Sequence, residues 1–154
     1  MPSAKCGFID APGGSRAIDL LVEFGPTIAV DIGFDPEYRY APNRPAPAVG
    51  MTGLRALVDT GASESCIDGT LAAALKLPVV DRRMTAGAHG AKEVNMHLAQ
   101  IHIPSLKFTI YGAFAGVDLH AGGQIHSALI GRTFLQHFKM IYDGTTGSVE
   151  LIGN

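Results

Sequence analysis

The chain has 154 residues, of which 47% are hydrophobic and 17% charged, and its formal net charge is −2 at pH 7. This composition is typical of a globular chain whose single core buries roughly 70% of the unfolded surface. It provides no basic surface for nucleic acid or an anionic membrane, and no run reaches the ~18 apolar residues that cross a bilayer. Two cysteines, Cys6 and Cys66, are too few for a disulfide scaffold and wrongly spaced for zinc. We therefore expect free thiols in a cytoplasmic protein.

The first part of the chain is predicted to be an extension followed by β structure. Residues 1–15 contain no apolar stretch of the kind found in a secretory leader. We expect them to form an N-terminal extension to a single domain that covers residues 16–154. Within this domain, residues 18–24 and 27–34 are predicted to be two strands joined at Gly25-Pro26.

The second of these strands alternates clearly, because Ile28, Val30 and Ile32 share one face. Residues 35–50 differ in character, since they hold four of the nine prolines of the chain. A Pro-rich segment can bind a partner, but an exposed irregular loop is the favoured interpretation. The sequence thus predicts a long surface loop before the next strand.

The most informative stretch of the chain is Asp59-Thr60-Gly61-Ala62, which follows the apolar run of residues 54–58. A buried strand that ends in Asp-Thr-Gly presents a carboxylate from a rigid support. The Thr hydroxyl can form a supporting hydrogen bond, and the Gly lets the backbone approach closely. The motif is therefore the prime candidate for a chemical site.

A helix and a long hairpin are predicted after this motif. Residues 67–77 have helical character, with Asp68 as the cap of the first turn. Residues 83–103 are predicted to be a hairpin whose tip, residues 86–91, is rich in small side chains. The apolar alternation of the return strand changes parity, which predicts a bulge near Ala99-Gln100.

The remainder of the chain is predicted to be mostly β structure, without an internal repeat. The predicted elements are a strand over residues 106–114, a loop over 115–127, an apolar segment with a glycine over 128–131, a helical turn over 134–138, and a closing hairpin of residues 140–142 with 148–152.

One carboxylate is only half of a site that activates water without a metal. Two carboxyl groups about 3 Å apart cannot both ionise, so one acts as the base and the other as the acid. No second Asp-Thr/Ser-Gly occurs, because Asp68-Gly69 and Asp143-Gly144 lack the hydroxyl residue and Asp31-Ile32-Gly33 has an apolar one. The second carboxylate is therefore expected from Asp59 of another copy of the chain.

Two segments together resemble the signature pair of the retropepsin-like aspartic proteases, single-domain relatives of pepsin that work as homodimers. They are Leu57-Val58-Asp59-Thr60-Gly61-Ala62-Ser63 and Ala128-Leu129-Ile130-Gly131-Arg132, in which Asp59 and Gly131 are 131 − 59 = 72 positions apart. The resemblance spans roughly Pro26 to Leu151, and relative to the family the 35–50 loop is an insertion.

The resemblance implies an all-β fold, a closed acid-protease barrel with one or two short helices. It implies a homodimeric aspartic endopeptidase that cleaves peptide or protein substrates and needs no metal or other cofactor. The implied roles are catalysis for Asp59, support for Thr60, Gly61 and Ala62, a substrate-covering flap for Gly87, Ala88, His89 and Gly90, and the second motif for Leu129, Ile130, Gly131 and Arg132.

The sequence departs from the family after Asp-Thr-Gly-Ala. Viral members often carry an acidic residue there that pairs with the Arg of the second motif, whereas this chain has Ser63 and then Glu64. Glu64 could pair with Arg132 instead, although its side chain would point the other way on a strand. The basis of dimer stability is thus left open.

Three other interpretations compete with this one. Residues 61–65, Gly-Ala-Ser-Glu-Ser, nearly match a Gly-x-Ser-x-Gly nucleophile elbow, but the last Gly is missing and no α/β pattern supports it. The six histidines form no metal-spaced helical pair, and His97 and His102 are expected on a strand face or edge. The third alternative is a retropepsin-like dimer that binds peptides or partner segments and cleaves little or nothing.

Overall fold

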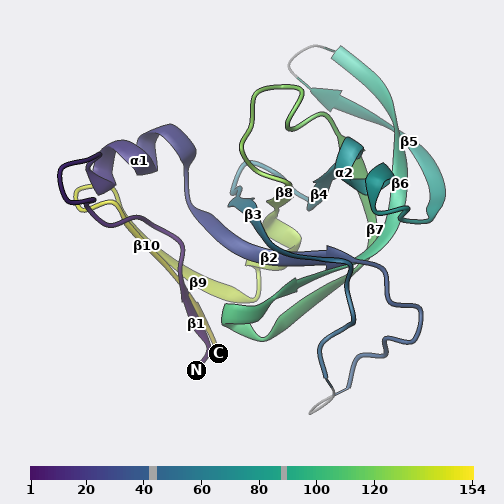
Figure 1. The fold of residues 1–154 in the computed structure, drawn as a ribbon, viewed down its shortest axis with the longest axis horizontal. Helices are drawn as coiled ribbons and strands as arrows, with labels where there is room; N and C mark the ends of the chain where they lie inside the picture. Colours follow the sequence, from purple (N-terminus) through teal and green to yellow (C-terminus); the bar gives the residue numbers. More distant parts are fainter. Residues whose placement is uncertain (42–44, 88–89) are drawn as a thin grey trace.

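The computed structural model describes residues 1–41, 45–87 and 90–154. Six strands close into a barrel in the order β2-β3-β8-β4-β7-β6, and pairing of β2 with β6 completes the ring (Figure 1). These strands are β2 (Thr27–Gly33), β3 (Met51–Val58), β4 (Cys66–Asp68), β6 (Gly90–Ile103), β7 (Phe108–Val117) and β8 (Ala128–Ile130). The predicted fold class, an all-β closed barrel of the acid-protease type, is confirmed.

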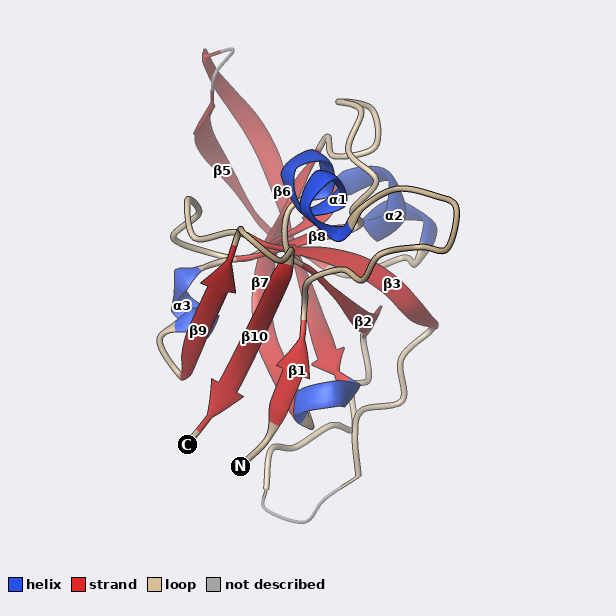
Figure 2. Cartoon of the chain, turned by 90° about the vertical axis from the view of Figure 1, so that its left-hand side faces the viewer, coloured by secondary structure: helices blue, strands red, loops and turns tan. Residues whose placement is uncertain are grey.

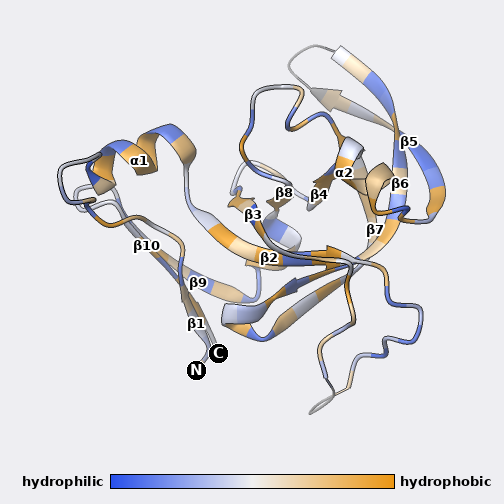
Figure 3. Cartoon of the chain, in the orientation of Figure 1, coloured by the Kyte–Doolittle hydropathy of each residue, from blue (hydrophilic) through white to orange (hydrophobic). Residues whose placement is uncertain are grey.

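The barrel encloses an apolar core made by the inward faces of its strands. The predicted alternation in β2 is confirmed, since Ile28, Val30 and Ile32 are all buried. They pack with fully buried isoleucines of other strands, among them Ile67 and Ile130. Figure 3 shows β2 as mostly hydrophobic, whereas β5 (Val79–Gly87) is hydrophilic only in its middle part. Among the described residues, β5 pairs with β6 alone and lies outside the barrel.

A second sheet of three strands joins the two ends of the chain (Figure 2). Its order is β1-β10-β9, with β1 (Ser3–Lys5), β10 (Ser148–Gly153) and β9 (Phe138–Asp143) all antiparallel. The closing hairpin predicted from the sequence is thereby confirmed. Residues 1–15 contribute β1 to this sheet and bury Cys6 completely, so the segment expected to be an extension is paired and packed.

The strand predicted over residues 18–24 is wrong, because α1 (Ala17–Phe24) is a helix there. Its apolar residues fit both periods, but the helix buries Ala17 and Leu21 on one face. The Asp10 carboxylate accepts a hydrogen bond from the Ala17 N–H at 2.8 Å and so satisfies the helix start. Gly25, at φ 72°, ends the helix and its N–H donates to Leu21 O.

Two further α-helices are short. α2 (Gly69–Ala74) is shorter than the predicted helix over residues 67–77, because the first of those residues belong to β4. The predicted cap is confirmed, since Asp68 accepts a hydrogen bond from the Leu71 N–H. α3 (Arg132–Leu135) follows β8, and a 3-10 turn, η1 (Pro104–Leu106), precedes β7. Within the described ranges, no helix has both the length and the apolarity needed to span a membrane.

The predicted bulge near Ala99-Gln100 is wrong. β6 runs in continuous register with β7 from Met96 to Ile103, and the irregularity lies on β5 between Val79 and Asp81. The parity change in the sequence has another cause, because both faces of β6 are buried in this stretch. The Gln100 side chain bonds to the backbone of Asp35, at the start of the Pro-rich loop, which covers the outer face.

Candidate active site

Asp59 lies immediately after β3, on a tight turn held by backbone hydrogen bonds. Its N–H donates to Ile130 O at 2.9 Å, and its carbonyl accepts from the Ala62 N–H at 3.2 Å. The Gly61 N–H donates to the Asp59 carboxylate at 2.8 Å. A Cβ on Gly61 would lie 3.1 Å from that same oxygen, so the absence of a side chain leaves room for the carboxylate. The carboxylate is fixed in direction and remains partly exposed.

The second motif lies directly behind this turn, because β8 runs between β3 and β4. β8 pairs parallel with β3, matching Val58 with Ile130, and antiparallel with β4. At its end, the Gly131 N–H donates to the Ser65 hydroxyl at 3.0 Å. A Cβ on Gly131 would lie 2.6 Å from the Glu64 carbonyl carbon and oxygen. Only glycine therefore allows the two segments to pack at this separation.

Arg132 ties the start of α3 to the same turn. Its N–H donates to Ala62 O at 2.9 Å, and its guanidinium donates to Thr60 O at 2.8 Å. Glu64 does not pair with Arg132, and its carboxylate lies 4.0 Å from the guanidinium of Arg83 on β5. Within one chain, Glu64 therefore does not serve as the acidic partner of Arg132. All four residues of the Asp-Thr-Gly-Ala stretch and the four of the second motif are brought together.

A cavity of about 440 Å³ opens beside the carboxylate. Asp59 and Thr60 line it together with Leu57 of the same segment and with apolar residues from two other places in the chain, namely Pro26, and Met140 with Tyr142. Burial raises the pKa of the nearby Cys66 thiol to about 11, and the charge of Asp59 adds to this effect. Cys66 and Cys6 are both free thiols, as expected, and Cys66 is uncharged at neutral pH.

The hairpin of β5 and β6 projects from the barrel on the far side of the molecule from α1 (Figure 1). Gly87 and Gly90 pair with each other close to its tip, and Gly90 has φ 96°, a backbone angle that favours glycine. The other two predicted flap residues, Ala88 and His89, lie outside the described residues. An ion pair between Lys92 of β6 and Asp118 links the hairpin to the loop of residues 118–127.

The competing site interpretations gain no support from the geometry. Ser63 is exposed on a loop, not on a strand-to-helix elbow, and His97 is buried with its ring against Leu77 O. His102 bonds to the Thr109 hydroxyl on the neighbouring strand. In the described part of the chain, no group of three His, Cys, Asp or Glu side chains is placed to hold a metal ion.

Two residues that organise this region were missed or only partly understood from the sequence. Ser65 holds Gly131, and a lone serine in a loop gives no signal of that contact. Asp68 was predicted only as a helix cap, but its other carboxylate oxygen also accepts from the N–H groups of Leu119 and His120. The buried carboxylate thus fixes the start of the 118–127 loop, and these contacts join residues about 50 positions apart.

The match to one protein family agrees with the sequence motif. The family described as gag-polyprotein putative aspartyl protease matches residues 49–137, which is more than half of the chain. Among solved structures, EIAV protease complexed with the inhibitor HBY-793 is similar at 20% identity and a TM-score of 0.44. That match covers 72% of this chain and 85% of the viral one. No curated protein matches the sequence.

Proposed function

Since the chain belongs to the gag-polyprotein aspartyl protease family, we propose that it is a homodimeric aspartic endopeptidase with Asp59 as its catalytic residue. The observation that carries the proposal is the placement of the Asp59 carboxylate. It is directed by the Gly61 N–H, supported from behind by β8 and Gly131, and partly exposed beside a cavity. A side chain with only a structural role would have no need of this access.

A second copy of the chain supplies the other half of the proposed site. The chain has one Asp-Thr-Gly, and Asp59 forms no ion pair with another described residue. For two carboxyl groups to share a proton, the copies must meet with their Asp59 residues about 3 Å apart. The surface that surrounds Asp59 must then lie in the interface, which includes Met140 and Tyr142 of β9. These side chains offer apolar area for association.

In the proposed reaction, the ionised Asp59 of one copy removes a proton from a water molecule. The water oxygen bonds to the carbonyl carbon of the peptide, while the protonated carboxyl group of the other copy donates its proton to the carbonyl oxygen. The C–N bond then breaks as the amine nitrogen takes up a proton from the carboxyl group that received one, while a hydroxyl group of the tetrahedral intermediate returns its proton to the other carboxylate. The original charge state of the pair is restored, and no covalent intermediate with the enzyme forms.

The β5–β6 hairpin is proposed to cover an extended substrate with its backbone, in the manner of an added strand. Gly87 and Gly90 suit this role, since glycine allows a close approach to a peptide. The Lys92–Asp118 ion pair joins the hairpin to the 118–127 loop at the protein surface. In this proposal the hairpin covers the site, and the reaction uses no metal or other cofactor.

The test compares wild type with Asp59→Asn on a pool of randomised 14-residue peptides, read by mass spectrometry. We expect cleavage to fall at least about a thousandfold, because the nearly isosteric change removes the general base. Asp19→Asn is the matched control, since Asp19 is exposed on α1 and pairs with Arg16. Unchanged cleavage by Asp59→Asn would contradict the proposal. Binding of the pool without cleavage by wild type would favour a peptide-binding module.

A further inference from the structure

In the described part of the chain, one edge of β7 has no neighbouring strand along most of its length. β7 pairs with β6 on one side, in register from Phe108 to Ala115. On the other side it pairs only with the three-residue strand β4, whose partners are residues 115–117. Within the described ranges, residues 108–114 therefore present a free strand edge, which at about 3.3 Å per residue is about 20 Å long.

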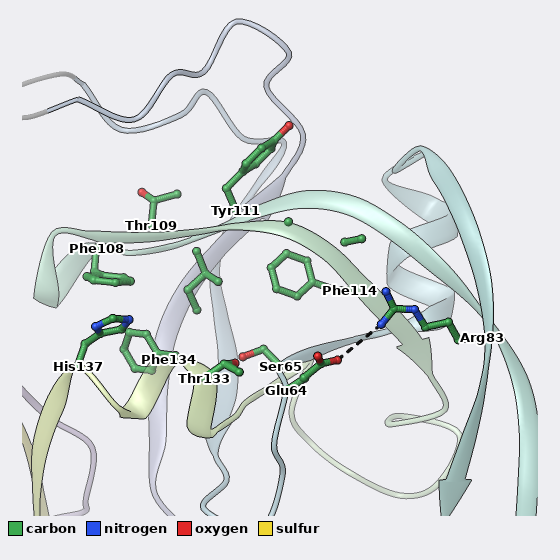
Figure 4. Close-up of a pocket in the computed structure, with 13 residues that line it drawn as sticks. Glu64, Ser65, Arg83, Phe108, Thr109, Tyr111, Phe114, Thr133, Phe134 and His137 are labelled. Atoms are coloured by element: carbon green, nitrogen blue, oxygen red, sulfur yellow. Dashed lines mark ion pairs between the residues drawn. The ribbon is translucent and has the colours of Figure 1, made fainter.

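A groove of about 470 Å³ runs beside this edge (Figure 4). Its other wall consists of Thr133 and Phe134 of α3, with Glu64 and Ser65 from the segment after the Asp59 turn. Figure 4 shows the side chains of this wall facing β7, with the Arg83 guanidinium at one end of the groove. The edge is thus recessed, and α3 limits the approach of a second sheet.

Apolar side chains form part of the floor of the groove. Ile110 and Phe114 of β7 contribute to it, and at one end Phe108 packs edge-on against Phe134 with ring centroids 5.2 Å apart. Charges lie at the opposite end, where Glu64 and Arg83 are 4.0 Å apart and both largely exposed. An ion pair of this separation and exposure is weak, so both groups are available to charged groups of a ligand.

We infer that this groove is a second peptide-binding site, in which an extended segment of the protein substrate pairs with the free edge of β7. A strand edge offers alternating N–H and C=O groups, and the ligand that satisfies them all is another extended chain. The recess admits a single strand, and the apolar part of its floor, which includes Phe108 and Ile110, accepts an apolar side chain of that strand. The inference rests on the proposed function and extends it to substrate outside the catalytic cleft.

The position of the groove supports this occupant. Glu64 and Ser65 follow Asp59 by five and six residues, and Arg83 lies on β5 of the hairpin proposed to cover the substrate. The groove is therefore lined by the two segments that would also border the cleft. In this proposal, a polypeptide that leaves the cleft past these two segments continues to the β7 edge, and such a site would favour long substrates over short ones.

The experiment measures backbone protection in the Asp59→Asn background, in which bound peptide would stay intact. The probe is the pool of randomised 14-residue peptides at high total concentration, because strand pairing through the backbone tolerates many sequences. Amide hydrogen exchange of residues 108–114 is followed by NMR. We expect exchange at the free edge to slow by about tenfold when the pool is added.

Two tryptophan variants make the test specific. Thr133→Trp, added to the Asp59→Asn chain, fills the groove from the exposed side of α3, and we expect it to abolish the protection. Gln136→Trp is the matched control, because Gln136 is exposed just after α3 and does not line the groove. Thr133→Arg replaces the tryptophan variant if thermal unfolding shows that Thr133→Trp does not fold.

Absence of protection on adding the pool, or equal protection in the Thr133 and Gln136 variants, would overturn the inference. Its failure is separable from failure of the proposed function, since the exchange measurement needs no cleavage. If wild type cleaves the pool while the β7 edge stays unprotected, the proposed protease function stands and the peptide-binding groove is rejected. If Thr133→Trp abolishes the protection but wild type never cleaves the pool, the peptide-binding groove stands and the proposed protease function is rejected.

Discussion

Gly131→Ala tests whether close packing of the second motif controls the geometry of Asp59. The new Cβ would lie 2.6 Å from the Glu64 carbonyl carbon and oxygen and 3.0 Å from Ala62 O, and all three are backbone atoms. Overpacking of this kind costs about 1–3 kcal/mol, and the lower entropy of the unfolded alanine chain offsets about 0.4–1 kcal/mol of it. We expect a net loss of about 1–2 kcal/mol, which lowers Tm by about 2–8 °C in a domain of this size.

The effect on activity is expected to exceed the effect on stability. The turn that carries Asp59 bonds to β8 and α3 on both sides of Gly131, so it must move to relieve the contact. A displacement of about 1 Å at a catalytic group can lower the rate by about a hundredfold. Peptide cleavage and thermal unfolding by circular dichroism measure the two effects.

Gly50→Ala is the matched control for this change. Its Cβ would meet only Leu75 Cδ2 at 3.6 Å, an ordinary contact, and Gly50 does not have a positive φ. We expect Tm and cleavage to remain close to wild type in this variant. Gly131→Ala with wild-type Tm and wild-type turnover would refute the argument that close packing at Gly131 positions Asp59.

Three further predictions follow from hydrogen bonds and pKa values. Ser65→Ala should lower the free energy of unfolding by about 1–3 kcal/mol in urea titrations, because it leaves the buried Gly131 N–H unpaired. The control Ser63→Ala, at an exposed position, should change it by less than about 0.5 kcal/mol. Equal losses in the two variants would contradict the role of Ser65 in holding Gly131. Burial lowers the pKa of His126 in the folded chain. At a pH below the ordinary pKa of about 6.5, the unfolded chain therefore binds a proton more readily than the folded chain does. The free energy of unfolding should therefore fall as the pH is lowered from about 7 to 5. Urea titrations of His126→Gln should show a smaller pH dependence, and an unchanged pH dependence would exclude His126 as its cause. Because the pKa of Cys66 is about 11, iodoacetamide should label it at pH 8 about a hundredfold more slowly in the folded than in the unfolded protein, and equal rates by mass spectrometry would contradict the assigned burial.

The turn that carries Asp59 could be predicted from the sequence because its determinants are local. Asp59-Thr60-Gly61 specifies a carboxylate on a turn, and the apolar run before it specifies the strand that ends there. The glycine of the second motif was recognised by resemblance, and the structure explains it by the closeness of Glu64. Ser65 could not be predicted, because its partner is 66 residues away and no local pattern marks it.

Helix α1 was mistaken for a strand because its apolar residues fit a period of two as well as a helical face. The hydrogen bond from the Ala17 N–H to the Asp10 carboxylate satisfies the start of the helix, and the sequence pattern of residues 17–24 does not contain this contact. The bulge near Ala99-Gln100 was inferred by assuming one buried face, and the contact of Gln100 with Asp35 buries the other. The flap residues Ala88 and His89, the cytoplasmic location and the dimer stay predictions.

Subunit mixing tests most directly the claim that two Asp59 residues form one site. Wild type at fixed concentration is incubated with a ninefold excess of Asp59→Asn, with subunit exchange followed by fluorescence labels, and cleavage per wild-type chain is measured. Random pairing leaves only about one wild-type chain in ten with a wild-type partner, so activity should fall about tenfold, while an inert protein at the same concentration should have no effect. Undiminished activity after complete exchange would contradict the shared site.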